Sequence, residues 1–217
     1  MDRIDIGGIG IAYELLGAAG APAVALTFGG RFAMTTPGLH ELGERLAEGG
    51  KRVLLWDRPN CGQSDLCLEA DAESQLHADV LAALIRKLDL GPTALAGGSA
   101  GSRVSLIAGS QHPDIVSHLV LWNITGGPIG LMNLAMIYAG ESAQMVNASG
   151  NMEAATRAFG WAEQCQVNPR IRDALLAQDP KAFIARMQQW AMAYAPSTAS
   201  PVPGMSPEAL PRSRCRC

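Results

Sequence analysis

The chain has 217 residues, of which 48% are hydrophobic and 17% are charged, and its formal net charge is -3. This size and apolar content suffice for the core of one generous domain and exclude a disordered chain. The near-neutral charge argues against nucleic acid as a partner, and no stretch approaches the roughly 18 consecutive apolar residues of a membrane-spanning helix. The first residues lack the basic and apolar segments of a secretion signal, so we expect a cytoplasmic protein without a membrane partner.

Strand and helix signals alternate along the first half of the chain. Two short strands, 3–6 and 10–16, form a predicted hairpin around Gly7 and Gly8. The apolar run 23–28 does not alternate with polar residues, which is typical of a strand buried on both faces of a sheet. Further strands are predicted at 51–56, from residue 93 and at 116–122, and helices at 37–48, 71–88 and 99–111. This order predicts an α/β fold with right-handed crossovers and a mostly parallel sheet.

From residue 124 to residue 195 the sequence carries only helical signals. Helix starts are predicted at Pro128, near Asn151, and where Asn168 and Asp179 each precede a proline. The second of these helices would place Met152, Ala155, Phe159 and Ala162 on one face, and the last would bring together Phe183, Met187 and Trp190. The methionines and aromatic residues suit an adaptable lid over an apolar pocket, and equally the ordinary packing faces of a small helical subdomain.

The chain therefore divides into a core at 1–123, a helical cap at 124–195, and a proline-rich linker with an irregular tail at 196–217. Five scattered cysteines favour free thiols over a disulfide framework. The pair Cys215 and Cys217 has neither the spacing nor the second ligand pair of a zinc site, so no metal is expected. The glycines at 7, 8 and 10 lie in the predicted hairpin and open no helix, so no nucleotide cofactor is expected either.

The stretch from Thr93 to Ser102 is a short apolar strand that breaks on glycines and turns directly into a helix. Gly97, Ser99 and Gly101 fit the pattern G-x-S-x-G, in which the glycines let strand and helix pass close together. The turn lifts the serine Oγ out of the sheet and places it at a helix N-terminus, where backbone N–H groups stabilise a developing oxyanion. The pattern predicts Ser99 as a catalytic nucleophile.

Four features together make the chain resemble the α/β-hydrolase family over about residues 4 to 210. They are the elbow at 97–101, the D-R-P-x-x-G-x-S loop at 57–64, the Phe28-Gly29-Gly30 turn and the helical insertion after Trp122. The resemblance implies an α/β fold with a mostly parallel sheet and a helical cap. It also implies a serine hydrolase that cleaves a small ester, lactone, amide or activated C–C bond through an acyl-enzyme at Ser99.

The resemblance also assigns roles to individual residues. Gly30 or Arg31 would donate one oxyanion N–H and Ala100 the other. The loop residues Asp57, Gly62 and Ser64 would be structural, and Asn60 stands where the family carries a glycine, a position that asparagine tolerates at positive φ. In a second interpretation, Arg31 binds a carboxylate of the substrate. In a third, which we favour over the second, Arg31 is a surface arginine on a mobile loop.

A serine nucleophile needs a histidine base and a carboxylate that orients it. His40 and His77 lie on predicted helices upstream of the elbow, His112 lies at the far end of the helix that Ser99 opens, and His118 lies inside the next strand. None of the four is therefore expected to act as the base for Ser99. Asn123, at one family position of the acid, is not ionisable. The Arg- and Cys-rich tail 211–217 indicates a shifted or truncated reading frame, so that the sheet lacks its last strands together with the acid and the histidine.

Without those strands, residues 116–122 would form an exposed sheet edge, which predicts homo-oligomers or poor solubility. Three hypotheses follow for function. The chain is a serine hydrolase of a small-molecule substrate, impaired by the missing triad members. Alternatively it is a non-catalytic remnant or small-molecule binding protein of the same fold. In the third hypothesis it is a structural partner completed by strands from another chain.

Overall fold

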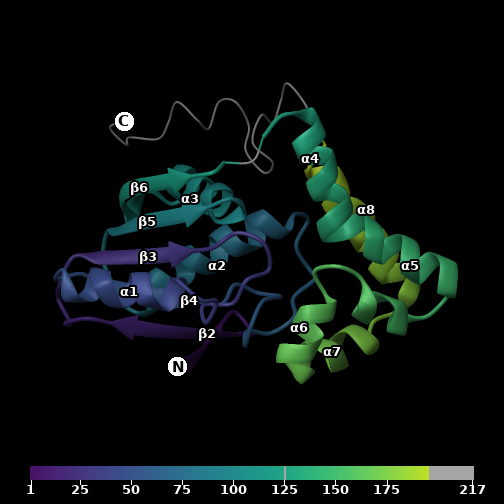
Figure 1. Cartoon of the computed structure of the whole chain (residues 1–217), viewed down its shortest axis with the longest axis horizontal. Helices are drawn as coiled ribbons and strands as arrows, with labels where there is room; N and C mark the ends of the chain where they lie inside the picture. The colour runs from purple at the N-terminus through teal and green to yellow at the C-terminus, as the bar shows by residue number, and fades with distance from the viewer. Residues whose placement is uncertain (125, 196–217) are drawn as a thin grey trace.

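A computed structural model describes residues 1–124 and 126–195, and these residues form a six-stranded sheet flanked by helices (Figure 1). The strand order is β1-β2-β4-β3-β5-β6, with β1 and β2 antiparallel to their neighbours and the other four strands parallel. The strands are β1 (Asp2–Ile6), β2 (Ile9–Leu16), β3 (Ala23–Thr27), β4 (Arg52–Trp56), β5 (Thr93–Gly98) and β6 (Val116–Trp122). The predicted α/β fold with a mostly parallel sheet is confirmed.

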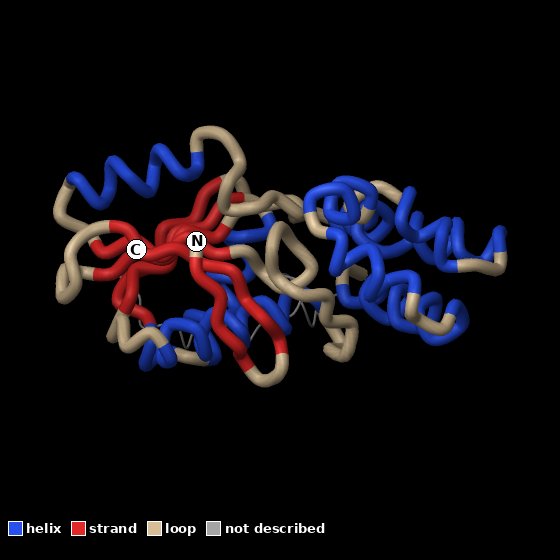
Figure 2. The backbone as a smooth tube through the Cα atoms, turned by 90° about the horizontal axis from the view of Figure 1, so that it is seen from below, coloured by secondary structure: helices blue, strands red, loops and turns tan. Residues whose placement is uncertain are grey.

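The two faces of the sheet carry separate hydrophobic clusters. Alternate residues of the central strands, Ala25, Leu54 and Leu95, pack with helices α2 (Glu73–Lys87) and α3 (Ala100–Gln111). Their neighbours, among them Leu26 and Leu55, face α1 (Leu39–Glu48) on the other side. Burial on both faces explains why the central strands are continuous apolar runs. Seen from below, the strands lie between these helical layers (Figure 2).

The helices after β6 form a second layer beside the carboxyl ends of the parallel strands (Figure 1). They are α4 (Pro128–Ala135), a π-helical turn (Met136–Gly140), α5 (Glu141–Ser149), a 3-10 turn (Met152–Arg157), α6 (Ala162–Val167), α7 (Pro169–Leu176) and α8 (Pro180–Ala193). Their apolar side chains make a third cluster, which includes Trp161, Phe183, Met187 and Trp190. The prediction that Phe183, Met187 and Trp190 pack together is confirmed.

Two predicted helix starts are confirmed by their caps, and one predicted helix is wrong. The side chain of Asn168 accepts a hydrogen bond from Arg170 N, and that of Asp179 accepts one from Ala182 N. The helix predicted from Asn151 is instead a 3-10 turn and a separate α6. The chain turns at Gly160, whose φ is 83°, and Phe159 is 65% exposed instead of joining the apolar face. Helical spacing alone did not reveal this glycine turn.

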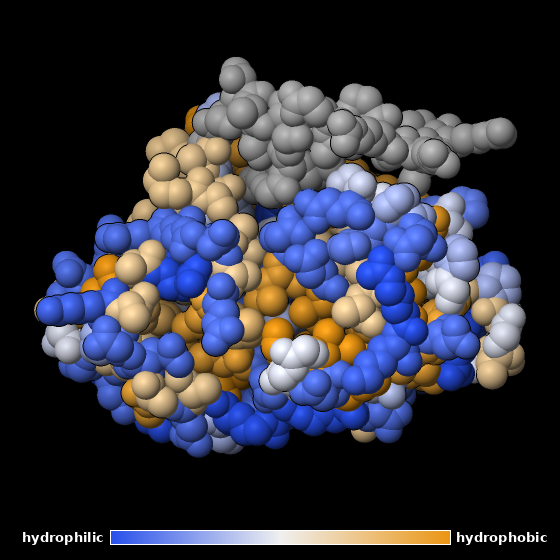
Figure 3. All heavy atoms as spheres, turned by 180° about the vertical axis from the view of Figure 1, so that it is seen from behind, coloured by the Kyte–Doolittle hydropathy of each residue, from blue (hydrophilic) through white to orange (hydrophobic). Residues whose placement is uncertain are grey.

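Within the described ranges, no helix is long and apolar enough to cross a membrane, and no group of three or more His, Cys, Asp or Glu side chains is arranged to hold a metal ion. From behind, hydrophilic residues cover most of the surface and hydrophobic ones show near its centre (Figure 3). The predicted linker and tail, 196–217, lie outside the described residues.

Strand β6 is an edge of the sheet formed by the described residues, and apolar side chains lie exposed along it. Val120 is 54% exposed and Trp122 is 40% exposed. Ile129 and Met132 of α4, the next helix along the chain, are exposed as well. An unpaired strand edge with apolar side chains favours pairing with another chain.

We therefore expect the protein to self-associate through β6. The substitution Val120→Lys places a charge on this edge and should shift the protein toward the monomer in sedimentation velocity. The matched control Val167→Lys, at another exposed valine far from the edge, should leave the distribution unchanged. A wild-type chain that stays monomeric at high concentration would contradict this expectation.

Candidate active site

Ser99 lies at the tight turn between β5 and α3, in a backbone conformation that serine rarely adopts. Its φ is 54° and its ψ is -119°, and α3 begins at the next residue, Ala100. The backbone N–H of Ser99 donates to the carbonyl of Trp122, 3.1 Å away at the end of β6. Such strained residues persist only where the surrounding structure fixes them, and they cluster at functional sites.

Glycines make the close packing around Ser99 possible. A Cβ on Gly97 would overlap the Gly101 carbonyl, and one on Gly101 would overlap the carbonyl of Thr27 at the end of β3. A Cβ on Gly29 would lie 2.6 Å from Ser99 Cβ and 3.1 Å from Ser99 Oγ. Strand β5, helix α3 and the turn after β3 therefore meet at the serine with no side chain between them.

The turn after β3 lies beside the start of α3. Gly30 has a φ of 55°, and Arg58 donates to the carbonyl of Gly30 at 2.6 Å and to that of Gly29 at 3.4 Å. Gly30, Arg31 and Ala100 line one small cavity of about 10 Å³, roughly the room that one water molecule needs. The structure thus brings together the three residues that the resemblance assigned to the oxyanion site.

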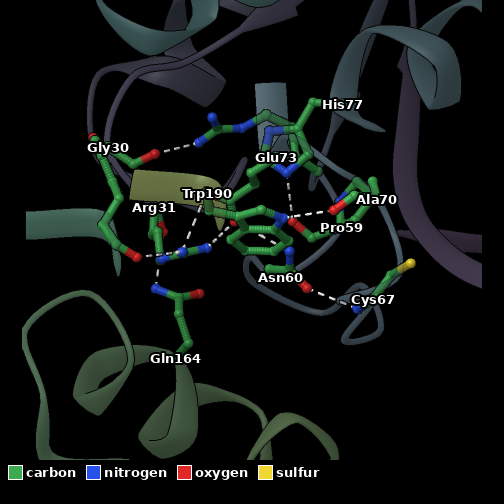
Figure 4. Close-up of polar contacts among 12 residues, drawn as sticks. Gly30, Arg31, Pro59, Asn60, Cys67, Ala70, Glu73, His77, Gln164 and Trp190 are labelled. Carbon is green, nitrogen blue, oxygen red and sulfur yellow. Dashed lines mark hydrogen bonds and ion pairs between the residues drawn. The ribbon is translucent and has the colours of Figure 1, made fainter. Parts of the chain in front are cut away.

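The side chain of Arg31 is buried, so the interpretation of Arg31 as a surface arginine on a mobile loop is wrong. It forms a two-pronged ion pair with Glu73 of α2 (Figure 4). Its guanidinium lies over the ring of Trp161, 4.0 Å from the centroid. Gln164 of α6 donates to the Arg31 carbonyl at 2.8 Å. Although burial alone would raise it, the guanidinium of Arg31 holds the pKa of Glu73 below its usual value.

The loop after β4 is fixed by hydrogen bonds within the core. The Asp57 carboxylate accepts from the backbone N–H of Met34 at 2.6 Å and of Gln63 at 2.7 Å. Ser64 Oγ donates to the Asp57 carbonyl at 2.6 Å and accepts from Ala12 N at 2.9 Å. Burial outweighs the two backbone donors and raises the pKa of Asp57. These side chains therefore have a structural role in holding the loop against β2 and the turn after β3.

Two residues of the same loop have positive φ. Gly62 has a φ of 52°, and a Cβ there would overlap the Asp57 carboxylate. Asn60 has a φ of 69°, as expected for a residue that stands in place of glycine. Its side chain also donates to Glu73 at 3.1 Å and accepts from Cys67 N at 2.7 Å (Figure 4), which links the loop to the Arg31 ion pair.

Among the described residues, no histidine makes a hydrogen bond to Ser99. His77 is buried and bonds to the carbonyl of Pro59 at 2.9 Å, and burial lowers its pKa to about 3. His40 pairs with carboxylates of β2 and α1, and His112 pairs with a carboxylate of α2. His118 lies exposed on β6. Asn123 follows β6 with a φ of 53° and carries no charge.

Sequence reasoning missed the partners of Arg31 and the side chain of Arg103. Glu73 and Trp161 come from segments 42 and 130 residues further along the chain, and no local pattern joins them to Arg31. Arg103 is buried one helical turn after Ser99 and lines the same cavity as Ala100. Arg103 stands four residues after Ser99, and residues at this spacing lie on the same face of a helix, so the spacing could have indicated that Arg103 lies near the elbow.

This fold and turn define a class of proteins: those with a tight strand-turn-helix elbow on a mostly parallel sheet and a helical segment after the strand that follows it. A family model described as the alpha/beta hydrolase fold matches residues 28–150, which is more than half of the chain. The chain belongs to the alpha/beta hydrolase fold family.

Curated relatives with sequence similarity are named 2-hydroxy-6-oxononadienedioate/2-hydroxy-6-oxononatrienedioate hydrolases. The one from Escherichia coli is 36% identical over 89 residues, 41% of this chain and 30% of the relative. The one from Burkholderia vietnamiensis is 32% identical over 119 residues, 54% of this chain and 41% of the relative. The match therefore spans less than half the length of these relatives.

Solved structures show the same fold. A thermophilic esterase from Thermogutta terrifontis superposes with a TM-score of 0.62 at 21% identity, over 99% of this chain and 78% of the esterase. An alpha/beta hydrolase enzyme from a deep-sea metagenome library of the Medee basin also gives 0.62, at 17% identity, over 99% of this chain and 76% of that enzyme.

The packing around the elbow predicts that it tolerates no added methyl group. Gly101→Ala would force its Cβ into the Thr27 carbonyl, so we expect a loss of about 2 kcal/mol or more in the free energy of unfolding, measured by urea denaturation. Gly126→Ala, where the added Cβ meets nothing within 4 Å, should change it by less than about 0.5 kcal/mol. Equal effects of the two substitutions would show that the elbow is not closely packed.

Buried neutral His77 predicts a pH dependence of stability. The unfolded chain binds a proton at His77 below pH 6.5 and the folded chain does so only near pH 3, so stability is lost as the pH falls between these values. From about pH 6 to pH 4, wild type should lose up to about 1.4 kcal/mol per pH unit more than His77→Gln, whose amide keeps a donor for Pro59. Urea denaturation across this range measures the difference, and His118→Gln, at an exposed position, should follow wild type.

Proposed function

We propose that this chain is a serine hydrolase of the α/β-hydrolase fold and that Ser99 is its nucleophile. The observation that carries the proposal is the strained backbone of Ser99, held against Gly29 at the start of a helix. In the reaction Ser99 Oγ attacks a carbonyl carbon of the substrate, its proton passes to a solvent water molecule in place of a histidine, and the carbonyl π electrons move onto the carbonyl oxygen. The backbone N–H groups of Ala100 and of Gly30 or Arg31 would stabilise that oxyanion.

The proposed substrate is a small ester, lactone or activated C–C bond next to a carbonyl group. The relatives whose names specify a substrate act on 2-hydroxy-6-oxononadienedioate and the corresponding trienedioate. A dioate carries two carboxylates, so by similarity we propose an oxo-acid or a related small acyl compound for this chain. The helical segment after β6 would cover it.

We also propose that turnover by this polypeptide is impaired. Serine alone is a weak nucleophile, and the described residues place neither a histidine nor its orienting carboxylate at Ser99. This observation favours, as the second candidate, a non-catalytic protein that binds a small molecule in the same site. The two candidates differ in whether Ser99 forms a covalent bond with an activated substrate.

Covalent labelling of Ser99 separates the two candidates. We expect a fluorophosphonate to label one site per chain, with the adduct on Ser99 in mass spectrometry, and no label on Ser99→Ala. Hydrolysis of a short activated ester should be slow and should fall at least about tenfold in Ser99→Ala, because the loss of a nucleophile costs orders of magnitude in rate.

Ser110→Ala is the matched control, since Ser110 sits at the far end of α3 and bonds only to the Ile107 carbonyl among the described residues. It should label and hydrolyse like wild type. If wild type and Ser99→Ala are labelled equally or hydrolyse the ester at the same rate, the proposal of a serine hydrolase is overturned. The second candidate, a non-catalytic protein that binds a small molecule, would then remain.

A further inference from the structure

Two backbone segments would donate to the proposed oxyanion, and each of them carries a buried arginine. Arg31 lies in the turn after β3, and Arg103 lies in the first turn of α3. In that first turn, the backbone N–H groups of Ser102 and Arg103 donate to the Ser99 carbonyl at 3.1 and 3.4 Å. Contacts that fix the two arginine side chains therefore also fix the backbone on both sides of the serine.

The guanidinium of Arg103 is held from two elements. Its Nε donates to Ser74 Oγ of α2 at 2.8 Å, and one Nη donates to the hydroxyl of Tyr194, just after α8, at 3.1 Å. The ring of Tyr194 also lies against this guanidinium, with its centroid 4.8 Å away. Since a buried charge is costly unless polar contacts satisfy it, the orientation of Arg103 depends on Tyr194.

Tyr138 makes a corresponding contact with Arg31. It belongs to the π-helical turn after α4, a kind of turn that is frequent at functional sites. The Tyr138 carbonyl accepts a hydrogen bond from one Nη of Arg31 at 3.4 Å, and the ring centroid lies 5.7 Å from the guanidinium carbon. The helical segment thus contacts the arginine of each backbone segment with a tyrosine.

The two tyrosines also contact each other. Their rings are stacked, with centroids 6.0 Å apart and an angle of 18° between the planes. We call this continuous set of contacts the arginine–tyrosine bridge, and its members in order are Arg31, Tyr138, Tyr194 and Arg103. All four line the cavity of about 10 Å³ beside Gly30 and Ala100, so little free space separates them.

We propose that Tyr138 and Tyr194 are positioning residues for the oxyanion site. The bridge joins the turn that carries Gly30 to the start of α3 that carries Ala100, and it sets the separation of their N–H groups. Donors stabilise a developing oxyanion most when their positions are fixed before the reaction. The inference rests on the proposed function and adds to it that the helical segment helps to build the oxyanion site, instead of only covering the substrate.

Labelling kinetics separate a positioning role from a structural one. The phosphonyl oxygen of a fluorophosphonate takes the place of the oxyanion, so the limiting rate of labelling at Ser99 reports on the donors. Tyr194→Leu should lower this rate at least about tenfold and change the half-saturating reagent concentration by less than about twofold, because the loss of an oxyanion donor acts on the reaction step. The control Tyr13→Leu makes the same change in β2, within the cluster under α2, and should label like wild type.

Hydrogen exchange tests the bridge without a nucleophile. In Tyr194→Leu, exchange should become at least about fivefold faster at amides that donate within the two backbone segments, namely those of Phe32, Ser102 and Arg103. The amides of β4 should keep their wild-type rates, which separates local loosening from a loss of global stability. Tyr13→Leu should leave the rates at the two segments unchanged.

Tyr194→Phe serves where Tyr194→Leu does not fold, as judged by circular dichroism. It keeps the ring and removes the hydroxyl that accepts from Arg103, so exchange should become faster at Ser102 and Arg103 and not at Phe32. Wild-type exchange in the Tyr194 variants, an equal increase in Tyr13→Leu, or a wild-type labelling rate in Tyr194→Leu would overturn the inference. Because hydrogen exchange needs no nucleophile, a failure of fluorophosphonate to label the wild-type chain would overturn the proposed function alone.

Discussion

The structure depends on one packing constraint, the contact of three backbone segments without side chains at Ser99. Gly29, Gly97 and Gly101 leave space that any added Cβ would fill, and so β3, β5 and α3 converge on the serine. Hydrogen bonds reinforce this contact: Ser99 N donates to Trp122 O at 3.1 Å, and Ser102 Oγ lies 2.7 Å from the same carbonyl. Backbone strain at a single residue is stable here because the packing on every side determines it.

A second constraint, the buried ion pair of Arg31 and Glu73, positions the helical segment over the core. Arg31 follows β3, Glu73 begins α2, and the ring of Trp161 lies against the guanidinium from the segment after α5. Gln164 adds a bond to the Arg31 carbonyl at 2.8 Å. Removal of two charges from water is costly unless further contacts satisfy them, and here Asn60 and Trp161 supply such contacts. We interpret this ion pair as the device that fixes the orientation of the two layers.

Features that depend on neighbours in sequence were predictable, and features that depend on distant partners were not. The strands, the elbow and the caps at Asn168 and Asp179 each carry their signal within a few residues, and the structure contains all of them. The sequence around Arg31 is that of an exposed glycine-rich turn, and its burial depends on Glu73, 42 residues away. Likewise, the helix predicted from Asn151 followed apolar spacing, but the left-handed Gly160 interrupts it.

The elbow and Arg103 beside it are held in place in different ways. Glycine packing and backbone hydrogen bonds hold Ser99 in place, and neither contribution requires a histidine or an acid, so a nucleophile geometry persists wherever this packing does. The buried guanidinium of Arg103 is different, because a buried charge is costly unless polar contacts satisfy it. Among the described residues, Ser74 and Tyr194 supply such contacts to Arg103, so the start of α3 depends on α2 and on the residue after α8 as well as on its own glycines.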